Sequence, residues 1–123
     1  MTLQDIKEFV MNQTGNDVAD VTEYMPFLLE YINEGYDRLV YAYTKEHIAA
    51  DSTSYPPLAN DTDTPNLSAW THLGIANWAT WCVYRNGNPS KQNRGFQFRA
   101  AAEETATQIR GGSKTVNFFN MPL

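Results

Sequence analysis

The sequence predicts an all-α fold, with four main helices packed around a buried third helix, a long loop before that helix and an extended C-terminal tail. Apolar residues recur every three or four positions over 3–10, 28–43 and 98–109, which is the helical period. Residues 70–84 are apolar on nearly all sides, as in a helix covered by others. The 123 residues most simply form one domain. We therefore expect a helical domain over 1–110 and a tail over 111–123.

The first helix is expected to begin after Thr2. Thr2 and Asp5 have the spacing of a capping box, and Gly15 supplies a stop. One face carries the apolar residues Leu3, Ile6, Phe9 and Val10.

The second helix is expected from about Glu23 to His47 or Ile48, with Pro26 tolerated in its first turn. One side is apolar and consists of Leu28, Leu29, Ile32, Tyr36, Leu39, Val40 and Tyr43. The opposite side, which we call the acidic face, consists of Glu30, Glu34, Asp37 and Tyr41.

Residues 49–67 are expected to form a loop, because prolines, aspartates and small polar residues leave no periodicity. A loop of this length in a compact domain is usually functional or mobile. Ser68 is the expected cap of the third helix, which includes Trp70 and runs through Tyr84.

The stretch RNGNP, residues 85–89, reads as a helix stop followed by a helix start. Gly87 is the expected left-handed terminator, Asn88 the N-cap and Pro89 the first residue of the fourth helix. The two helices should therefore form an antiparallel hairpin. The fourth helix should end at 111–112, and its inner face consists of Phe98, Ala102, Ala106 and Ile109.

The first turns of the fourth helix carry basic residues where the helix dipole disfavours cations. We define the basic face as Lys91, Arg94, Phe96 and Arg99. Residues placed against their local preference often have a partner elsewhere, although solvated surface charge is the plain alternative. Either a neighbouring copy or the chain's own second helix offers acids to meet them.

Charge is unevenly distributed along the chain, whose net charge is −5. Residues 1–84 hold three basic and twelve acidic side chains, net −9, and residues 85–123 hold six and two, net +4. Opposite signs suit internal pairing or head-to-tail association of copies. The tail adds Val116, Phe118 and Phe119, which a monomer has difficulty burying and a partner copy would cover.

Three stretches carry a family resemblance. They are EYINEGYDRLVYAY (30–43), WTHLGIANWATWCVYRNGNPSKQNRGFQF (70–98) and the ending NFFNMPL. Together they resemble the small all-helical head-tail connector (neck or adaptor) proteins of tailed bacteriophages and prophages. The likeness covers most of the chain and is weakest over 49–67.

The resemblance implies a structural role without catalysis or cofactor. Such a protein forms a head-to-tail ring beneath the phage portal protein, extends the DNA channel and joins the capsid to the next neck or tail-completion protein. DNA passes through without specific binding. The implied location is the head-tail junction of the virion, after synthesis in the cytoplasm of the host bacterium, and no membrane is involved. Nothing at the amino terminus resembles a signal peptide.

Several chemical readings are weaker. Glu30, Glu34 and Asp37 would need carboxylates from a second helix to hold Mg²⁺, and only the adjacent Glu103 and Glu104 offer them. Residues 60–64, NDTDT, begin like a calcium loop but lack its later glycine and glutamate. Cys82 and His72 have no third orienting group, so a buried cysteine is the simpler reading. We expect no metal and no catalytic residue.

The competing function is DNA binding, as in a small terminase-like packaging protein. The third and fourth helices, around their tight glycine turn, could be read as a helix-turn-helix, with Lys91, Gln92, Asn93 and Arg94 near the start of a recognition helix. A third helix that is wholly buried and an acidic domain argue against this reading.

Overall fold

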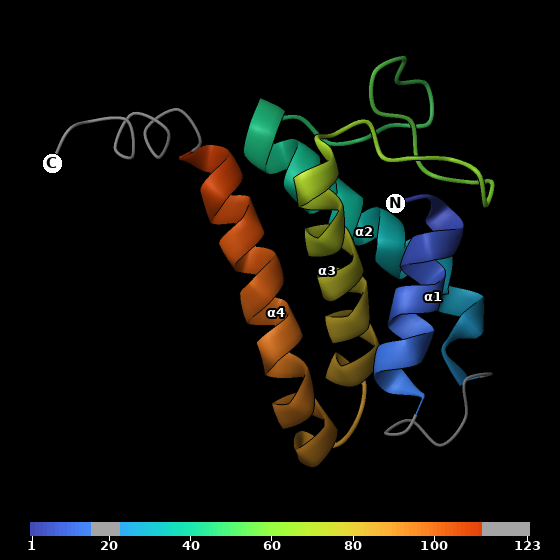
Figure 1. The fold of residues 1–123 in the computed structure, drawn as a ribbon, viewed down its shortest axis with the longest axis vertical. Helices are drawn as coiled ribbons and strands as arrows, with labels where there is room; N and C mark the ends of the chain where they lie inside the picture. The colour runs from blue at the N-terminus through green and yellow to red at the C-terminus, as the bar shows by residue number, and fades with distance from the viewer. Residues whose placement is uncertain (16–22, 112–123) are drawn as a thin grey trace, which may run out of the picture.

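The computed structural model describes residues 1–15 and 23–111, and within them the fold is all-α, as predicted. Its helical elements there are α1 (Leu3–Thr14), α2 (Met25–Thr44), the 3₁₀ turn η2 (Ala69–Thr71), α3 (His72–Arg85) and α4 (Pro89–Arg110). Figure 1 shows α3 between α4 and α1, with α2 crossing behind it. No helix in these ranges has the length and hydrophobicity needed to cross a bilayer.

The start of α1 is fixed twice, by its own cap and by the long loop. The Thr2 hydroxyl accepts from the Asp5 amide at 3.2 Å, and the Asp5 carboxylate accepts from the Thr2 amide at 2.9 Å, which confirms the capping box. Two further free amides of the first turn, those of Leu3 and Gln4, donate to loop carbonyls at 2.7 and 3.1 Å. The loop therefore satisfies donors that every helix start leaves unpaired.

Helix α2 is shorter than expected at both ends. Lys45 adopts a left-handed conformation (φ 66°), so the helix ends at Thr44 and not at His47 or Ile48. On its apolar side, Leu28, Ile32, Tyr36, Leu39 and Val40 are buried. The other two residues of the apolar side are more exposed, Leu29 at 37% and Tyr43 at 66%. Periodicity shows which side of a helix is apolar but not how far along its length neighbours cover that side.

The long loop is anchored to α2. The side-chain amide of Asn33 donates to the Leu58 carbonyl at 2.9 Å and accepts from the Leu58 amide at 2.8 Å. The Asn66 amide donates to the Tyr36 hydroxyl at 3.0 Å. Leu58 itself is buried in the main core. The loop thus forms the cover of the core at one end of the bundle (Figure 1).

Helix α3 is the central helix, and its predicted burial is confirmed. Twelve of its fourteen residues are buried. The predicted cap at Ser68 was wrong, because η2 comes first and the Ser68 side chain makes no capping hydrogen bond. The Ser68 carbonyl instead accepts from the amide and the hydroxyl of Thr71, so α3 begins only at His72. Trp70, on η2, is 56% exposed.

The turn between α3 and α4 confirms the antiparallel hairpin (Figure 1) and corrects one detail. Asn88 is the N-cap, its side chain accepting from the Lys91 amide at 3.0 Å, and Pro89 is the first helical residue. Gly87 is not left-handed, and no glycine in the described ranges has positive φ. The Gly87 amide donates to the Tyr84 carbonyl at 3.0 Å, so a tight right-handed turn ends α3.

Two glycines allow α2 and α4 to approach α3 closely. A Cβ on Gly35 would lie 2.9 Å from the Ile75 carbonyl oxygen and 3.1 Å from the Trp78 Cβ. A Cβ on Gly95 would lie 2.5 Å from the Tyr84 Cβ and 2.8 Å from the Trp81 ring. These four residues of α3 are themselves buried, so they cannot move aside cheaply.

Gly95→Ala is expected to destabilise the protein by about 1–3 kcal/mol, because the overlap with α3 exceeds the roughly 1 kcal/mol that alanine gains in helix propensity. Urea unfolding followed by circular dichroism measures the change. The matched control is Asn93→Ala, which is exposed on the same helix and should leave stability unchanged or slightly raised. Equal stability of the two variants would contradict a close contact at Gly95.

Candidate subunit interface

Glu34 of the acidic face is held by α3. Its carboxylate accepts from the Trp78 indole at 2.6 Å, the Cys82 thiol at 3.2 Å, and both terminal nitrogens of Arg85 at 2.8 and 3.1 Å. The three donors stand four and three residues apart, so they share one side of α3. We call these four residues the Glu34 cluster.

The cluster fixes the protonation of its members. Partial burial by itself would raise the pKa of Glu34, but the hydrogen bonds from Arg85, Trp78 and Cys82 outweigh it, and the pKa is lowered. Burial, together with the adjacent carboxylate, raises the pKa of the Cys82 thiol strongly. Cys82 is therefore a neutral hydrogen-bond donor, which is opposite to the thiolate that a nucleophile needs.

Asp37 and Tyr41 hold the chain that leaves α2. The Asp37 carboxylate lies 2.8 Å from His47 Nδ1 and accepts from the Ile48 amide at 2.8 Å. The Tyr41 ring stacks on His47 with centroids 4.7 Å apart. Two of the three predicted interface carboxylates, Glu34 and Asp37, thus have partners within the monomer.

The remaining carboxylate of the acidic face, Glu30, is exposed beside apolar side chains. Met25, Phe27 and Leu29 in the first turns of α2 are 41%, 48% and 37% exposed. A surface hollow of about 550 Å³ runs along this part of the helix and is lined by Pro26, Leu29, Glu30, Tyr31, Asn33, Glu34 and Arg85. We call Met25, Phe27, Leu29 and Glu30 the α2 patch.

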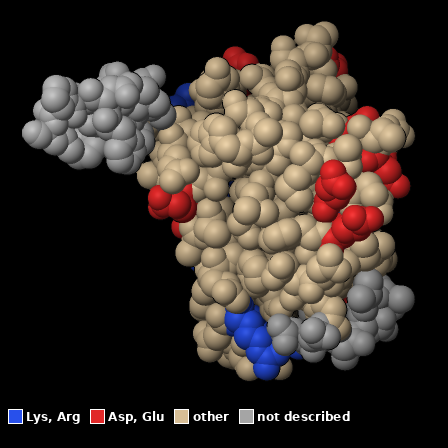
Figure 2. Space-filling model, in the orientation of Figure 1, with Lys and Arg blue, Asp and Glu red and all other residues tan. Residues whose placement is uncertain are grey.

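The structure divides the predicted basic face into two parts. Lys91 lines a hollow of about 370 Å³ that it shares with Tyr24, the N-cap of α2, and with Phe27 and Tyr31 of α2. Lys91 is thus directed toward its own second helix. Arg94 is exposed one turn further along α4. Figure 2 shows basic side chains at the end of the bundle where α3 turns into α4, and acidic side chains over α1, at the loop end and on the α4 side.

Phe96 and Arg99 lie against α3 instead. The Phe96 ring stacks on Trp81 with centroids 5.3 Å apart, and the Arg99 guanidinium lies 5.6 Å from the same ring. Arg99 also donates to Glu103 at 3.2 Å. Phe96 still has 46% of its surface exposed, so an aromatic side chain and two arginines form an outer surface on α4. We call Arg94, Phe96 and Arg99 the α4 patch.

Alternative chemistry finds little support in the geometry. Across 1–15 and 23–111, no three His, Cys, Asp or Glu side chains are grouped as metal ligands. In the NDTDT stretch, the Asp63 carboxylate accepts from the amides of Ala59 and Asn60 and closes a turn. His72 bonds to the Leu67 carbonyl at 2.9 Å and to the Met1 amino group, whereas Cys82 bonds to Glu34.

The helix-turn-helix reading also differs from the arrangement found. In that motif two helices cross at about 90–120°, whereas α3 and α4 run antiparallel along their length (Figure 1). The Gln92 side chain, near the start of the would-be recognition helix, donates to the Arg85 carbonyl at 3.0 Å and is partly buried.

Sequence reasoning missed the donors of the Glu34 cluster and the Arg38 contact. Arg38 lies 3.9 Å above the Trp78 ring and 3.9 Å from the Glu103 carboxylate, linking α2 to α4 across α3. The sequence signal for the Glu34 cluster was the spacing of Trp78, Cys82 and Arg85, which places these three donors on one side of an otherwise apolar helix. The predicted tail contacts Val116, Phe118 and Phe119 lie outside the described residues.

Comparison with known proteins gives no relative: no family model, no curated protein and no solved structure matches the chain.

Glu34→Gln is expected to lower the free energy of unfolding at pH 7 by about 1–2 kcal/mol. The variant loses a charged acceptor of four hydrogen bonds, and solvent screening of the partly exposed pair limits the loss. Chemical denaturation measures it. Glu30→Gln, one turn earlier and exposed, is the matched control and should change stability little.

The stability difference between wild type and Glu34→Gln should depend on pH. Because the pKa of Glu34 is lowered in the folded protein, its contribution is complete above the unfolded pKa of about 4.3 and is lost as pH falls through the folded pKa. The difference should therefore narrow as pH is lowered below about 4. A difference that stays constant from pH 7 to pH 3 would contradict the ionic role of Glu34.

Proposed function

We propose that the protein is a structural head-tail connector subunit that forms a ring beneath a phage portal, extends the DNA channel and joins the capsid to the neck or tail. The observation that carries this proposal is the pair of separate outer surfaces, the α2 patch with its acid and the α4 patch with its arginines. The sequence resemblance supports the same function. The site of action would be the head-tail junction of the virion.

The two patches suit a head-to-tail contact. Each combines exposed apolar or aromatic side chains with charge, and the signs are opposite, so the α2 patch of one copy complements the α4 patch of the next. A contact between two different surfaces repeats from copy to copy and closes into a ring when the rotation allows. Because Glu34 and Asp37 have partners inside the monomer, the proposal places Glu30 at the contact.

The charge balance is compatible with DNA passing through the ring. Binding to phosphates requires clustered positive charge, and the chain carries a net charge of −5. A ring of acidic subunits would let DNA slide through without holding it. This distinguishes the proposed function from a packaging protein that reads DNA.

Electron microscopy of the purified protein mixed with the portal of its own phage tests the proposal. We expect an added ring on the portal, coaxial with its channel. The free protein can remain monomeric, since the portal supplies a template for closure. Absence of any ring, alone or on the portal, would contradict the proposal, and DNA affinity that falls steeply with salt would favour the DNA-binding alternative.

A charge exchange tests the contact itself. Glu30→Lys and Arg94→Glu are each expected to reduce ring assembly by about tenfold or more, because like charges then face each other across the contact. The double variant should restore assembly. Circular dichroism of each variant serves as the folding control. Assembly by either folded single variant as efficient as that of wild type would place the contact elsewhere.

A further inference from the structure

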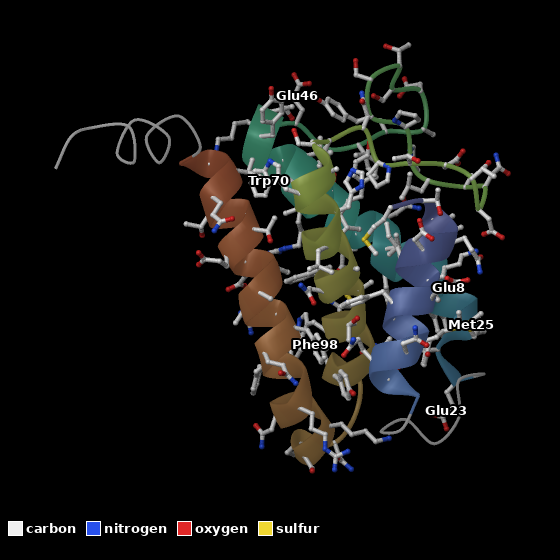
Figure 3. The ribbon with its side chains drawn as sticks, in the orientation of Figure 1. Glu8, Glu23, Met25, Glu46, Trp70 and Phe98 are labelled. Atoms are coloured by element: carbon white, nitrogen blue, oxygen red, sulfur yellow. The ribbon has the colours of Figure 1, made fainter. Side chains whose placement is uncertain are left out.

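A mixed aromatic and polar groove lies at the end of the bundle where α2 and α4 finish. It has a volume of about 440 Å³ and is lined by Tyr43, Tyr55, Asn66, Leu67, Ser68, Trp70, Thr71, Gln108 and Ile109. Tyr43 is 66% and Trp70 56% exposed, so two large aromatic side chains stand at its surface. Figure 3 shows Trp70 and Glu46 at this end of the molecule. We call it the Trp70 groove.

The described chain ends beside this groove. Gln108 and Ile109 belong to its lining, and Gly111 follows two residues later. The remaining segment, 112–123, reads GSKTVNFFNMPL, with apolar residues Val116, Phe118, Phe119, Met121 and Leu123 set among asparagines. It carries one cation, Lys114, and no acid.

The composition of this segment complements the groove. Aromatic side chains such as Phe118 can pack on Trp70 and Tyr43, while the Ser68 hydroxyl and the side-chain oxygens of Asn66 and Gln108 can bond the backbone of an extended peptide. Lys114 would find an acid at the same end of the molecule in Glu46 (Figure 3). We propose that the Trp70 groove binds the C-terminal segment 112–123 of a neighbouring copy.

A neighbour is favoured over the same chain by geometry. The copies in a ring are related by rotation about one axis, so equivalent residues of all copies lie at the same height along that axis. Since the tail starts beside the groove of its own copy, it also starts level with the groove of the next. Gly111 to Phe118 spans at most about 25 Å when extended, so Phe118 can reach a groove that lies within that distance of Gly111 on the next copy. The chain's own segment would have to reverse immediately after residues that themselves line the groove. The inference rests on the proposed ring and assigns one of its contacts.

Photo-crosslinking of the full-length protein tests this assignment. A benzoyl-phenylalanine replaces Phe118 in an unlabelled chain, which is mixed in equal amount with an isotope-labelled chain without the probe, at concentrations up to the millimolar range. Mass spectrometry then identifies the joined peptides. We expect the unlabelled tail to join the labelled peptide that contains Trp70 or Ile109.

Two variants make the result specific. Trp70→Ala should lower the yield of this crosslink by about tenfold, because an aromatic anchor is worth more than 1 kcal/mol at a contact. Leu73→Ala is the matched control, since Leu73 is 48% exposed on the next turn and does not line the groove. Equal yields for the two variants would overturn the role of the groove.

The other outcomes separate the two proposals. Crosslinks found only within unlabelled chains would overturn binding to a neighbour, as would crosslinks to another surface of the labelled chain, and the latter would leave self-association standing. If electron microscopy shows rings but no crosslinks form, the binding of the tail in the Trp70 groove would be overturned and the proposed ring would stand. Absence of crosslinks from a protein that forms no ring, alone or on the portal, would overturn both.

Discussion

The fold depends on the burial of α3 on nearly every side. The neighbouring elements pack against this one helix. Because it is buried, each hydrogen-bond donor on it requires an acceptor. Glu34 supplies that acceptor for Trp78, Cys82 and Arg85, and Gly35, next to it, lets α2 come close enough to do so. Close packing and hydrogen bonding are thus achieved at the same turn of α2.

This arrangement also decides which side chains are left for a partner. Glu34 and Asp37 accept hydrogen bonds from within the chain, and Arg99 donates to Glu103 and lies over the Trp81 ring. What remains outside is a set of apolar side chains in the first turns of α2 and an aromatic, basic surface on α4.

Local signals in the sequence predicted much of the fold. The capping box at Thr2, the Asn88–Pro89 start of α4 and the all-round burial of α3 depend on neighbouring residues and a single period, and each is confirmed. The end of α2 was predicted three residues too late or more, because the left-handed Lys45 has no sequence signature. Gly87 was expected to be left-handed, but it lies in a tight right-handed turn.

The candidate interface was less predictable for a physical reason. A helical wheel places Glu30, Glu34 and Asp37 on one face but cannot show that α3 and the loop supply partners to two of them. Lys91 and Phe96 lie on the same helix, yet one faces α2 and the other packs on Trp81. Contacts between elements that are distant in sequence determine which neighbour each of these side chains faces, and a single sequence contains little information about those contacts.

Hydrogen exchange of the free protein and of the protein assembled on the portal tests most directly whether these outer surfaces form the contact. The account predicts added protection in the first halves of α2 and α4, with α3 already protected in both states because it is buried. Assembled protein in which those two segments exchange as fast as in the free protein would contradict it.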